Sequence, residues 1–237
     1  SADHVSRSLV LGGEVVPSGT MTYMTGIRTT VDGKSFCGGS LISPTHVLTT
    51  TICIGPKEPN WVSIGTHYLN GTQDGEQIKV VKAQNHTSFN SSTGSYDFAL
   101  LTLERASKFK PVKLPAADDS DIIPGMWSKF VGWGYTSYPN GSQAYELQGV
   151  GLQVWGNEDC GQVYSVDNTM VCAGGVIGKD ACDGDAGAPL IKERGPRDEG
   201  DIVIGLGSWG TACGVGYPTV FSRASSALEW INSVMQA

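Results

Sequence analysis

Short apolar or β-branched segments, separated by turn-forming residues, dominate the pattern along the chain. Alternating or continuous apolar side chains predict strands at Thr20–Arg28, Trp61–Ile64, Gln77–Ala83, Phe98–Leu103, Lys129–Trp133, Leu147–Trp155 and Asp201–Trp209. Turn signals stand between them at Asp32-Gly33, Asn70-Gly71 and Asn140-Gly141. This pattern predicts an all-β protein.

A segment without periodicity divides the predicted strands into two groups. Residues 111–126 carry proline, aspartate and alanine, and we interpret them as a connector. The β-rich halves on either side are then residues 10–110 and residues 127–237. We expect the two halves to form one domain overall.

The end of the chain has a different period. Four apolar residues fall on one face at helical spacing, namely Leu228, Ile231, Val234 and Met235. Ser226 and Glu229 form a capping-box pattern, in which the serine caps an early amide and the glutamate reaches back. The sequence therefore predicts a short terminal helix that docks on the sheet.

Composition and charge narrow the class of protein further. The chain has 237 residues, 32 glycines and only 16% charged residues, which suits a turn-rich β protein of one compact unit. Its net charge of −7 argues against nucleic acid and anionic membranes as partners and favours a basic partner. No run of eighteen apolar residues occurs, so we predict no membrane span. We infer that a signal peptide was removed before residue 1.

Cysteines and glycosylation sequons together indicate an oxidising compartment. Six cysteines allow fifteen pairings if all are bonded. Four Asn-X-Ser/Thr sequons begin at Asn70, Asn85, Asn90 and Asn140. An even cysteine count and several sequons favour a secreted protein.

Seven segments resemble, in order, those of trypsin-like serine proteases. They are Val10–Gly13 (VLGG), Phe36–Ser43 (FCGGSLIS), Val47–Cys53 (VLTTTIC), Asp97–Leu100 (DFAL), Gly132–Gly134 (GWG), Asp180–Pro189 (DACDGDAGAP) and Ser208–Gly210 (SWG). The resemblance implies two antiparallel six-stranded β-barrels packed face to face, with a C-terminal helix. It also implies three disulfides, which are Cys37–Cys53, Cys160–Cys172 and Cys182–Cys213.

Two of the three catalytic positions of that family hold residues without catalytic chemistry. Ile52 stands where the family has its histidine, and Ala186 where it has its serine nucleophile. An isoleucine cannot accept a proton and an alanine methyl cannot attack a carbonyl, so we expect a pseudoprotease and no enzyme. Asp97 remains at the orienting position, and the family resemblance predicts a hydrogen bond to it from Ser208.

No other residue of the sequence is expected to restore the chemistry. The four histidines, His4, His46, His67 and His86, are scattered along the chain. We expect His46 to pack on a strand and His86 to have no catalytic role. The cysteines are accounted for by disulfides, so we predict no metal site and no cofactor.

The stretch from Asp180 to Pro189 raises two questions of its own. Asp180 matches the aspartate at the bottom of the family's specificity pocket, with Ser208, Trp209 and Gly210 on the wall. It is either a retained site for a basic side chain or a relic held by neighbouring polar groups. Asp185 matches the aspartate that pairs with the ammonium released by cleavage before Val10. We hypothesise that Asp185 lacks this partner and that residues 180–189 are zymogen-like or rearranged.

A narrower resemblance is to the glucanase inhibitor proteins of oomycete plant pathogens. It rests on Ile52 and Ala186 and on the segments Ser8–Gly13, Leu48–Thr51, Gly65–Gly71 and Trp230–Ser233. It implies an effector secreted into the host apoplast that binds and inhibits a plant endo-β-1,3-glucanase. Five loops are candidates for that contact, at residues 53–60, 68–76, 87–96, 136–145 and 192–201.

Two alternatives from other classes stay open at this point. One is a glycan- or cell-wall-binding module that uses surface tryptophans such as Trp61 or Trp155. The other is a hydrolase with non-standard chemistry.

Overall fold

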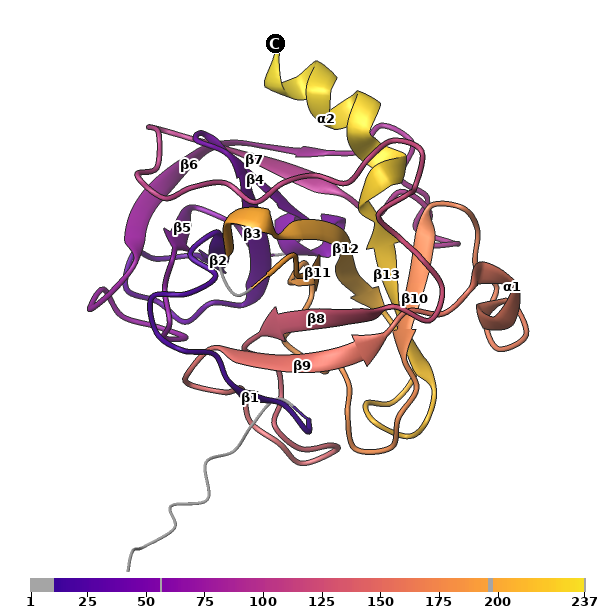
Figure 1. Cartoon of the computed structure of the whole chain (residues 1–237). Helices are drawn as coiled ribbons and strands as arrows, with labels where there is room; N and C mark the ends of the chain where they lie inside the picture. Colours follow the sequence, from indigo (N-terminus) through magenta and orange to yellow (C-terminus); the bar gives the residue numbers. More distant parts are fainter. Residues whose placement is uncertain (1–10, 56, 196–197, 237) are drawn as a thin grey trace, which may run out of the picture.

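The chain folds into two β-rich bodies that lie side by side, with a helix at the C-terminus (Figure 1). The computed structural model describes residues 11–55, 57–195 and 198–236. The first body is a closed barrel in the strand order β2-β3-β4-β7-β6-β5. Its strands are β2 (Met24–Arg28), β3 (Cys37–Ser43), β4 (His46–Thr49), β5 (Trp61–Ile64), β6 (Glu76–Asn85) and β7 (Ala99–Leu103). All neighbouring pairs in it are antiparallel.

The second body is an antiparallel sheet in the order β1-β9-β8-β11-β12-β13-β10. Its strands are β1 (Glu14–Val15), β8 (Trp127–Gly132), β9 (Gln148–Gln153), β10 (Met170–Gly174), β11 (Pro189–Lys192), β12 (Ile202–Trp209) and β13 (Pro218–Arg223). Just beyond β9, Val154 forms a bridge with Ala173 of β10, so the sheet curls toward a barrel. The predicted all-β, trypsin-like two-barrel fold with a terminal helix is confirmed.

Two details of the second body and of β2 differ from the sequence prediction. The two-residue strand β1 pairs Glu14 with Gly149 and adds a seventh strand, which is too short to leave a periodic signal. The strand predicted from Thr20 begins only at Met24, because Met21 has a φ of 50° and a turn precedes the strand.

The helices are short, with α1 at Asn157–Cys160 and α2 at Leu228–Met235. The expected apolar face of α2 is present, since Ile231 is fully buried in the core. The capping-box prediction is wrong. A 3-10 turn at Ala224–Ala227 runs directly into α2, so Ser226 lies inside a helical turn and its hydroxyl donates to the Arg223 carbonyl at 2.7 Å.

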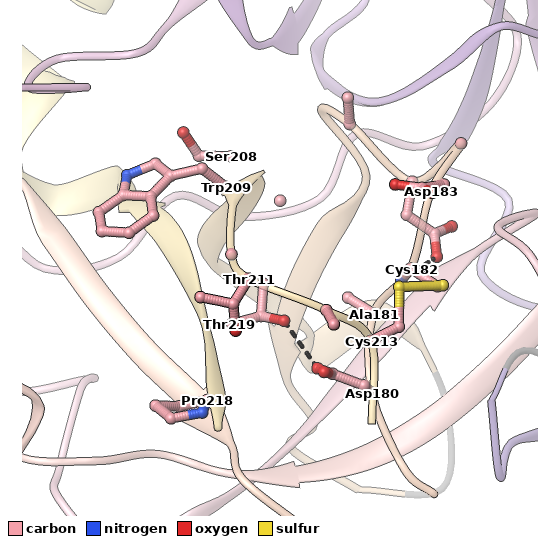
Figure 2. Close-up of a pocket in the computed structure, with 16 residues that line it drawn as sticks. Asp180, Ala181, Cys182, Asp183, Ser208, Trp209, Thr211, Cys213, Pro218 and Thr219 are labelled. Carbon is pink, nitrogen blue, oxygen red and sulfur yellow. Dashed lines mark hydrogen bonds between the residues drawn. A yellow bond between two sulfur atoms is a disulfide. The ribbon is translucent and has the colours of Figure 1, made fainter. Parts of the chain in front are cut away.

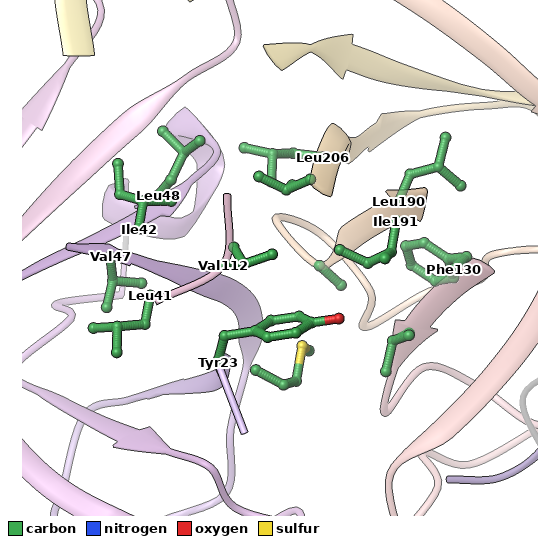
Figure 3. Close-up of a cluster of buried hydrophobic side chains, with 14 of the residues drawn as sticks. Tyr23, Leu41, Ile42, Val47, Leu48, Val112, Phe130, Leu190, Ile191 and Leu206 are labelled. Carbon is green, nitrogen blue, oxygen red and sulfur yellow. The ribbon is translucent and has the colours of Figure 1, made fainter. Parts of the chain in front are cut away.

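The core is continuous across the two bodies (Figure 3). Side chains of the first barrel face those of the second, and the labelled ones are Tyr23, Leu41, Ile42, Val47, Leu48, Val112, Phe130, Leu190, Ile191 and Leu206. Tyr23 also donates its hydroxyl to the Asp201 carboxylate at 2.8 Å across this boundary. The apolar burial holds the barrels in a fixed relation, which positions the loops between them.

Three disulfides cross-link the chain, with the pairing that the family resemblance implied. They are Cys37–Cys53, Cys160–Cys172 and Cys182–Cys213. A disulfide of this kind typically contributes about 2–4 kcal/mol to the free energy of unfolding. Within the described part of the chain, no helix has the length and apolar character needed to cross a membrane.

Candidate functional site

A groove of about 820 Å³ lies where loops of the two barrels meet. Four segments line it, at residues 51–55 after β4, 89–97 before β7, 163–165 between α1 and β10, and 208–209 at the end of β12. The apolar side chains among them are Ile52, Phe89, Val163, Tyr164 and Trp209. This groove, which we call the junction groove, contains Ile52 and Asp97, two of the three positions where the sequence predicted the remains of a catalytic triad.

Asp97 lies at the floor of the junction groove and is buried, with 7% of its surface exposed. One carboxylate oxygen accepts the Thr51 backbone N–H at 2.9 Å and the other accepts the Ser208 hydroxyl at 2.6 Å. A buried carboxylate without such donors would be costly, so these two bonds account for its burial.

The side chains of Ile52, which lines this groove, and of Ala186, which lines the neighbouring cavity, are hydrocarbon. Ile52 stands on the short 3-10 helix Thr51–Ile54 and is 63% exposed. Ala186 is half-buried, and its carbonyl accepts the Gly38 N–H at 2.9 Å. Neither side chain has a lone pair that could take a proton or attack a carbonyl.

Three of the histidines have other contacts. The Nδ1 atom of His46 is hydrogen-bonded to the Ser43 hydroxyl at 2.8 Å, and burial lowers the pKa of His46. His67 lies 3.3 Å from Glu146. His86 stacks on Tyr96 with ring centres 4.6 Å apart, and burial lowers its pKa. His4 lies outside the described residues.

A second cavity, of about 170 Å³, lies beside the junction groove and shares Ser208 and Trp209 with it (Figure 2). Asp180 forms part of its lining and is only 2% exposed. One oxygen of Asp180 accepts the Thr219 hydroxyl at 2.6 Å, and the other accepts the Gly214 N–H at 2.9 Å. Burial raises the pKa of Asp180, and these two hydrogen bonds oppose that rise. Of the two interpretations of Asp180, a retained site for a basic side chain or a relic held by neighbouring polar groups, this geometry favours the second.

Asp185 is also buried, at 3% exposure, and is held by backbone donors. Its oxygens accept the Gly134 N–H at 2.7 Å and the Cys182 N–H at 3.1 Å. Burial raises the pKa of Asp185 to about 7. Among the described residues no cation pairs with it. Val10, whose ammonium the hypothesis concerned, lies outside the described residues.

The backbone around Ala186 fits only small residues. Gly187 has a φ of +74°, and a Cβ there would lie 2.1 Å from the Thr49 hydroxyl oxygen. The Ala188 methyl is fully buried, because Gly38 opposite leaves room for it. The loop therefore keeps a tight course although Ala188 departs from the family's glycine.

The other predicted site residues are placed as follows. All four sequon asparagines, Asn70, Asn85, Asn90 and Asn140, are exposed. The tryptophans of the glycan-binding alternative are half-buried, and the Trp155 indole donates to the Gly174 carbonyl at 3.0 Å. In the described ranges no group of three His, Cys, Asp or Glu side chains could hold a metal ion.

The sequence missed several residues that shape these two sites. Phe89, Val163 and Tyr164 line the junction groove, and Thr219 closes over Asp180. None belongs to a motif, and Thr219 lies 39 residues from Asp180 along the chain. The only signal for Thr219 was its place in the strand after the SWG segment.

Comparison with known proteins gives the family context. The trypsin family model matches residues 10–231. Glucanase inhibitor protein 3 of Phytophthora infestans is 77% identical over 235 residues, which is 99% of this chain and 91% of that protein. Glucanase inhibitor protein 2 of the same organism is 69% identical over 99% of this chain and 92% of that protein. Glucanase inhibitor protein 2 of Phytophthora sojae is 63% identical over 99% of this chain and 82% of that protein.

Proposed function

Because the chain belongs to the trypsin family and, within it, groups with the glucanase inhibitor proteins, we propose that it inhibits a glucanase and does not cleave peptides. The observation that carries this proposal is 77% identity, over 99% of the chain, to a protein named as a glucanase inhibitor. The target is a plant endo-β-1,3-glucanase, as the resemblance of the sequence implies.

The geometry of the junction groove supports a role without catalysis. Asp97 uses its two oxygens on Thr51 and Ser208, and the side chains at positions 52 and 186 are hydrocarbon. Removing the nucleophile or the base of a serine protease triad lowers turnover by about 10⁶-fold. The residual rate is too small for a protease, so recognition is the function that the fold retains.

Loops on rigid barrels supply the surface for recognition. Two of the candidate loops, residues 53–60 and 87–96, reach the junction groove, and Ile52 exposes 63% of its surface beside them. A specific complex buries roughly 1,200–2,000 Å² in total, and a few aromatic or arginine side chains dominate its affinity. The groove offers Phe89, Tyr164 and Trp209 as such residues.

Secretion into the host apoplast is part of the same proposal. The structure has three disulfides, and disulfides form and persist mainly in oxidising compartments. The four sequon asparagines are exposed and so accessible to glycosylation.

The test is an inhibition assay with laminarin as substrate. The disulfide-bonded chain is added in increasing amounts to a purified plant endo-β-1,3-glucanase, with trypsinogen as a control of the same fold. We expect laminarin hydrolysis to fall until the chain equals the enzyme in amount, and no effect of trypsinogen. Undiminished hydrolysis with no complex on size-exclusion chromatography would rule out the inhibitor function.

A second assay separates the inhibitor from the hydrolase alternative. The chain is incubated with peptide substrates and with a fluorophosphonate probe that labels active serines. We expect no peptide cleavage and no labelling, because position 186 has no hydroxyl. Labelling of one site per molecule would favour the hydrolase instead.

A further inference from the structure

A third cavity, of about 300 Å³, lies beside α1. Figure 1 shows α1 on the side of the second body that faces away from the first barrel. The lining comes from residues 119–124, 155–157, 168 and 223, and none of these lines the junction groove or the second cavity. Its volume is at the lower end of the range for small-molecule sites. We call it the α1 cavity.

Arg223, at the end of β13, is the centre of a fixed polar frame in the α1 cavity. Its side chain is only 11% exposed. It donates to the Met170 carbonyl at 2.9 Å, to the Asp119 carboxylate at 2.6 Å and to the Asn157 side-chain oxygen at 2.7 Å. These acceptors belong to β10, to the connector and to α1, so the guanidinium is held in place before any ligand binds.

The polar frame keeps hydrogen-bonding capacity for a ligand. A guanidinium has five N–H donors and Arg223 uses three of them, so two remain. Each carboxylate oxygen of Asp119 accepts one hydrogen bond, from Arg223 or from Ser225, and has room for a second. Asn168 adds an exposed amide, which both donates and accepts. Donors and acceptors therefore occur together in the lining.

Apolar side chains supply the rest of the lining, namely Ile122, Pro124 and Trp155. Trp155 is one of the tryptophans of the glycan-binding alternative. Its indole N–H donates to the Gly174 carbonyl at 3.0 Å, which fixes the ring and leaves only its apolar surface for a ligand. An apolar wall beside amide, carboxylate and guanidinium groups suits a pyranose, because the ring carbons are apolar and the hydroxyls both donate and accept.

The charges around the α1 cavity favour a neutral ligand. Asp119 and Arg223 form an ion pair, so the lining itself has no net charge. Asp118 and Asp159 are exposed next to lining segments, and their negative charges oppose an anion. A cation would meet the positive charge of Arg223.

We propose that the α1 cavity binds a neutral pyranose ring of a glycan. Hydroxyls of the ring donate to Asp119 and accept from Arg223, and its carbons contact Trp155. The site goes beyond the inhibitor proposal and does not depend on it, because it is tested without a glucanase. Two sources supply such rings, namely cell-wall polysaccharides and the N-linked glycans of proteins, and the test distinguishes them.

The test is an NMR titration of the isotope-labelled, disulfide-bonded chain with three neutral sugars. Methyl β-D-glucoside represents a glucan chain, and methyl α-D-mannoside and N-acetylglucosamine represent N-linked glycans. We expect saturable binding of at least one sugar, with shifts at the Asn168 side-chain amide and the Arg223 Nε–H. Glucuronate, which is an anion, and protonated glucosamine, which is a cation, should bind no more tightly than the neutral sugar.

Three variants locate the binding. Asn168→Ala removes an exposed amide and should raise the dissociation constant about fivefold, which corresponds to one neutral hydrogen bond. Asn168→Trp should abolish binding, because a larger side chain at this exposed position fills the opening of the cavity. Trp127→Ala is the matched control. Trp127 is 66% exposed and lies outside the lining, so its removal should leave the dissociation constant unchanged.

Each other outcome counts against the assignment. Failure of all three neutral sugars to bind, up to their solubility limits, would overturn it. Tenfold tighter binding of glucuronate or of glucosamine would make the cavity a site for an ion. Unchanged binding in both Asn168 variants would place the sugar elsewhere, and loss of binding in Trp127→Ala alone would place it on the outer face of β8. Circular dichroism and Tm establish that each variant is folded.

Discussion

The floors of the junction groove and of the second cavity carry carboxylates held in the same way. Asp97 accepts one hydroxyl at 2.6 Å and one backbone N–H at 2.9 Å. Asp180 also accepts one hydroxyl at 2.6 Å and one backbone N–H at 2.9 Å. The two regions differ in which of the family's functional side chains they keep. In the groove of Asp97 the family's catalytic histidine position holds the hydrocarbon side chain of Ile52, whereas the aspartate of the family's specificity pocket is retained as Asp180.

This difference indicates why both acids remain in a chain proposed to have no catalytic chemistry. Each carboxylate accepts a partly buried backbone N–H, and a hydrogen bond to a charged group contributes about 1.5–3 kcal/mol. We therefore expect Asp97 and Asp180 to stabilise the fold, and the exposed side chain of Ile52 to contribute little to stability. Asp185 is a third case, because its two donors are both backbone N–H groups.

The largest effect is expected at Asp185 and depends on pH. Its pKa is about 7 in the folded chain against an ordinary 3.8, so the folded state binds more protons between these values. The contribution of Asp185 to the free energy of unfolding is therefore greatest below pH 3.8, and it falls as the pH rises toward about 7. The slope is at most about 1.4 kcal/mol per pH unit. Urea unfolding of wild type and Asp185→Asn across pH 4–7 should differ by this slope.

A neighbour provides the matched control for that measurement. Asp183 is exposed and lies two residues away, and its charge is a minor cause of the raised pKa of Asp185, so Asp183→Asn should change the pH dependence of wild type only slightly. Identical pH profiles for wild type and Asp185→Asn would mean that Asp185 is ionised throughout the range and has a cationic partner.

An intermediate effect is expected when either hydroxyl donor is removed. Ser208→Ala leaves one oxygen of Asp97 without its donor, and Thr219→Val does the same for Asp180. Each variant should lose about 1–3 kcal/mol in the free energy of unfolding, measured by urea denaturation. Ser91→Ala, which removes an exposed hydroxyl from the groove lining, should change it by less than about 0.5 kcal/mol. A loss of stability in only one of the two variants would show that the hydroxyl donors to Asp97 and Asp180 are not equivalent.

The sequence predicted the barrels and their order, because apolar segments and family motifs extend along most of the chain. The disulfide pairing followed from the same resemblance. The hydrogen bond from Thr219 to Asp180 was not predictable, since it depends on the register in which β13 pairs Thr219 with Ala173. The capping box at Ser226 failed for a related reason. A local pattern does not show that a helical turn already precedes the residue.

The smallest effect is expected at Ile52, where the chemistry of the junction groove is lost by substitution. Since Ile52 is 63% exposed, Ile52→Ala should change the free energy of unfolding by less than about 0.5 kcal/mol. Urea denaturation of Ile52→Ala and Ser208→Ala compares two positions in one groove. One holds a side chain that replaces the family's catalytic histidine, and the other holds the hydroxyl donor to the retained Asp97. A loss above about 1 kcal/mol would mean that isoleucine stabilises the groove. A neutral result would show that stability does not require the apolar side chain that the groove exposes to solvent.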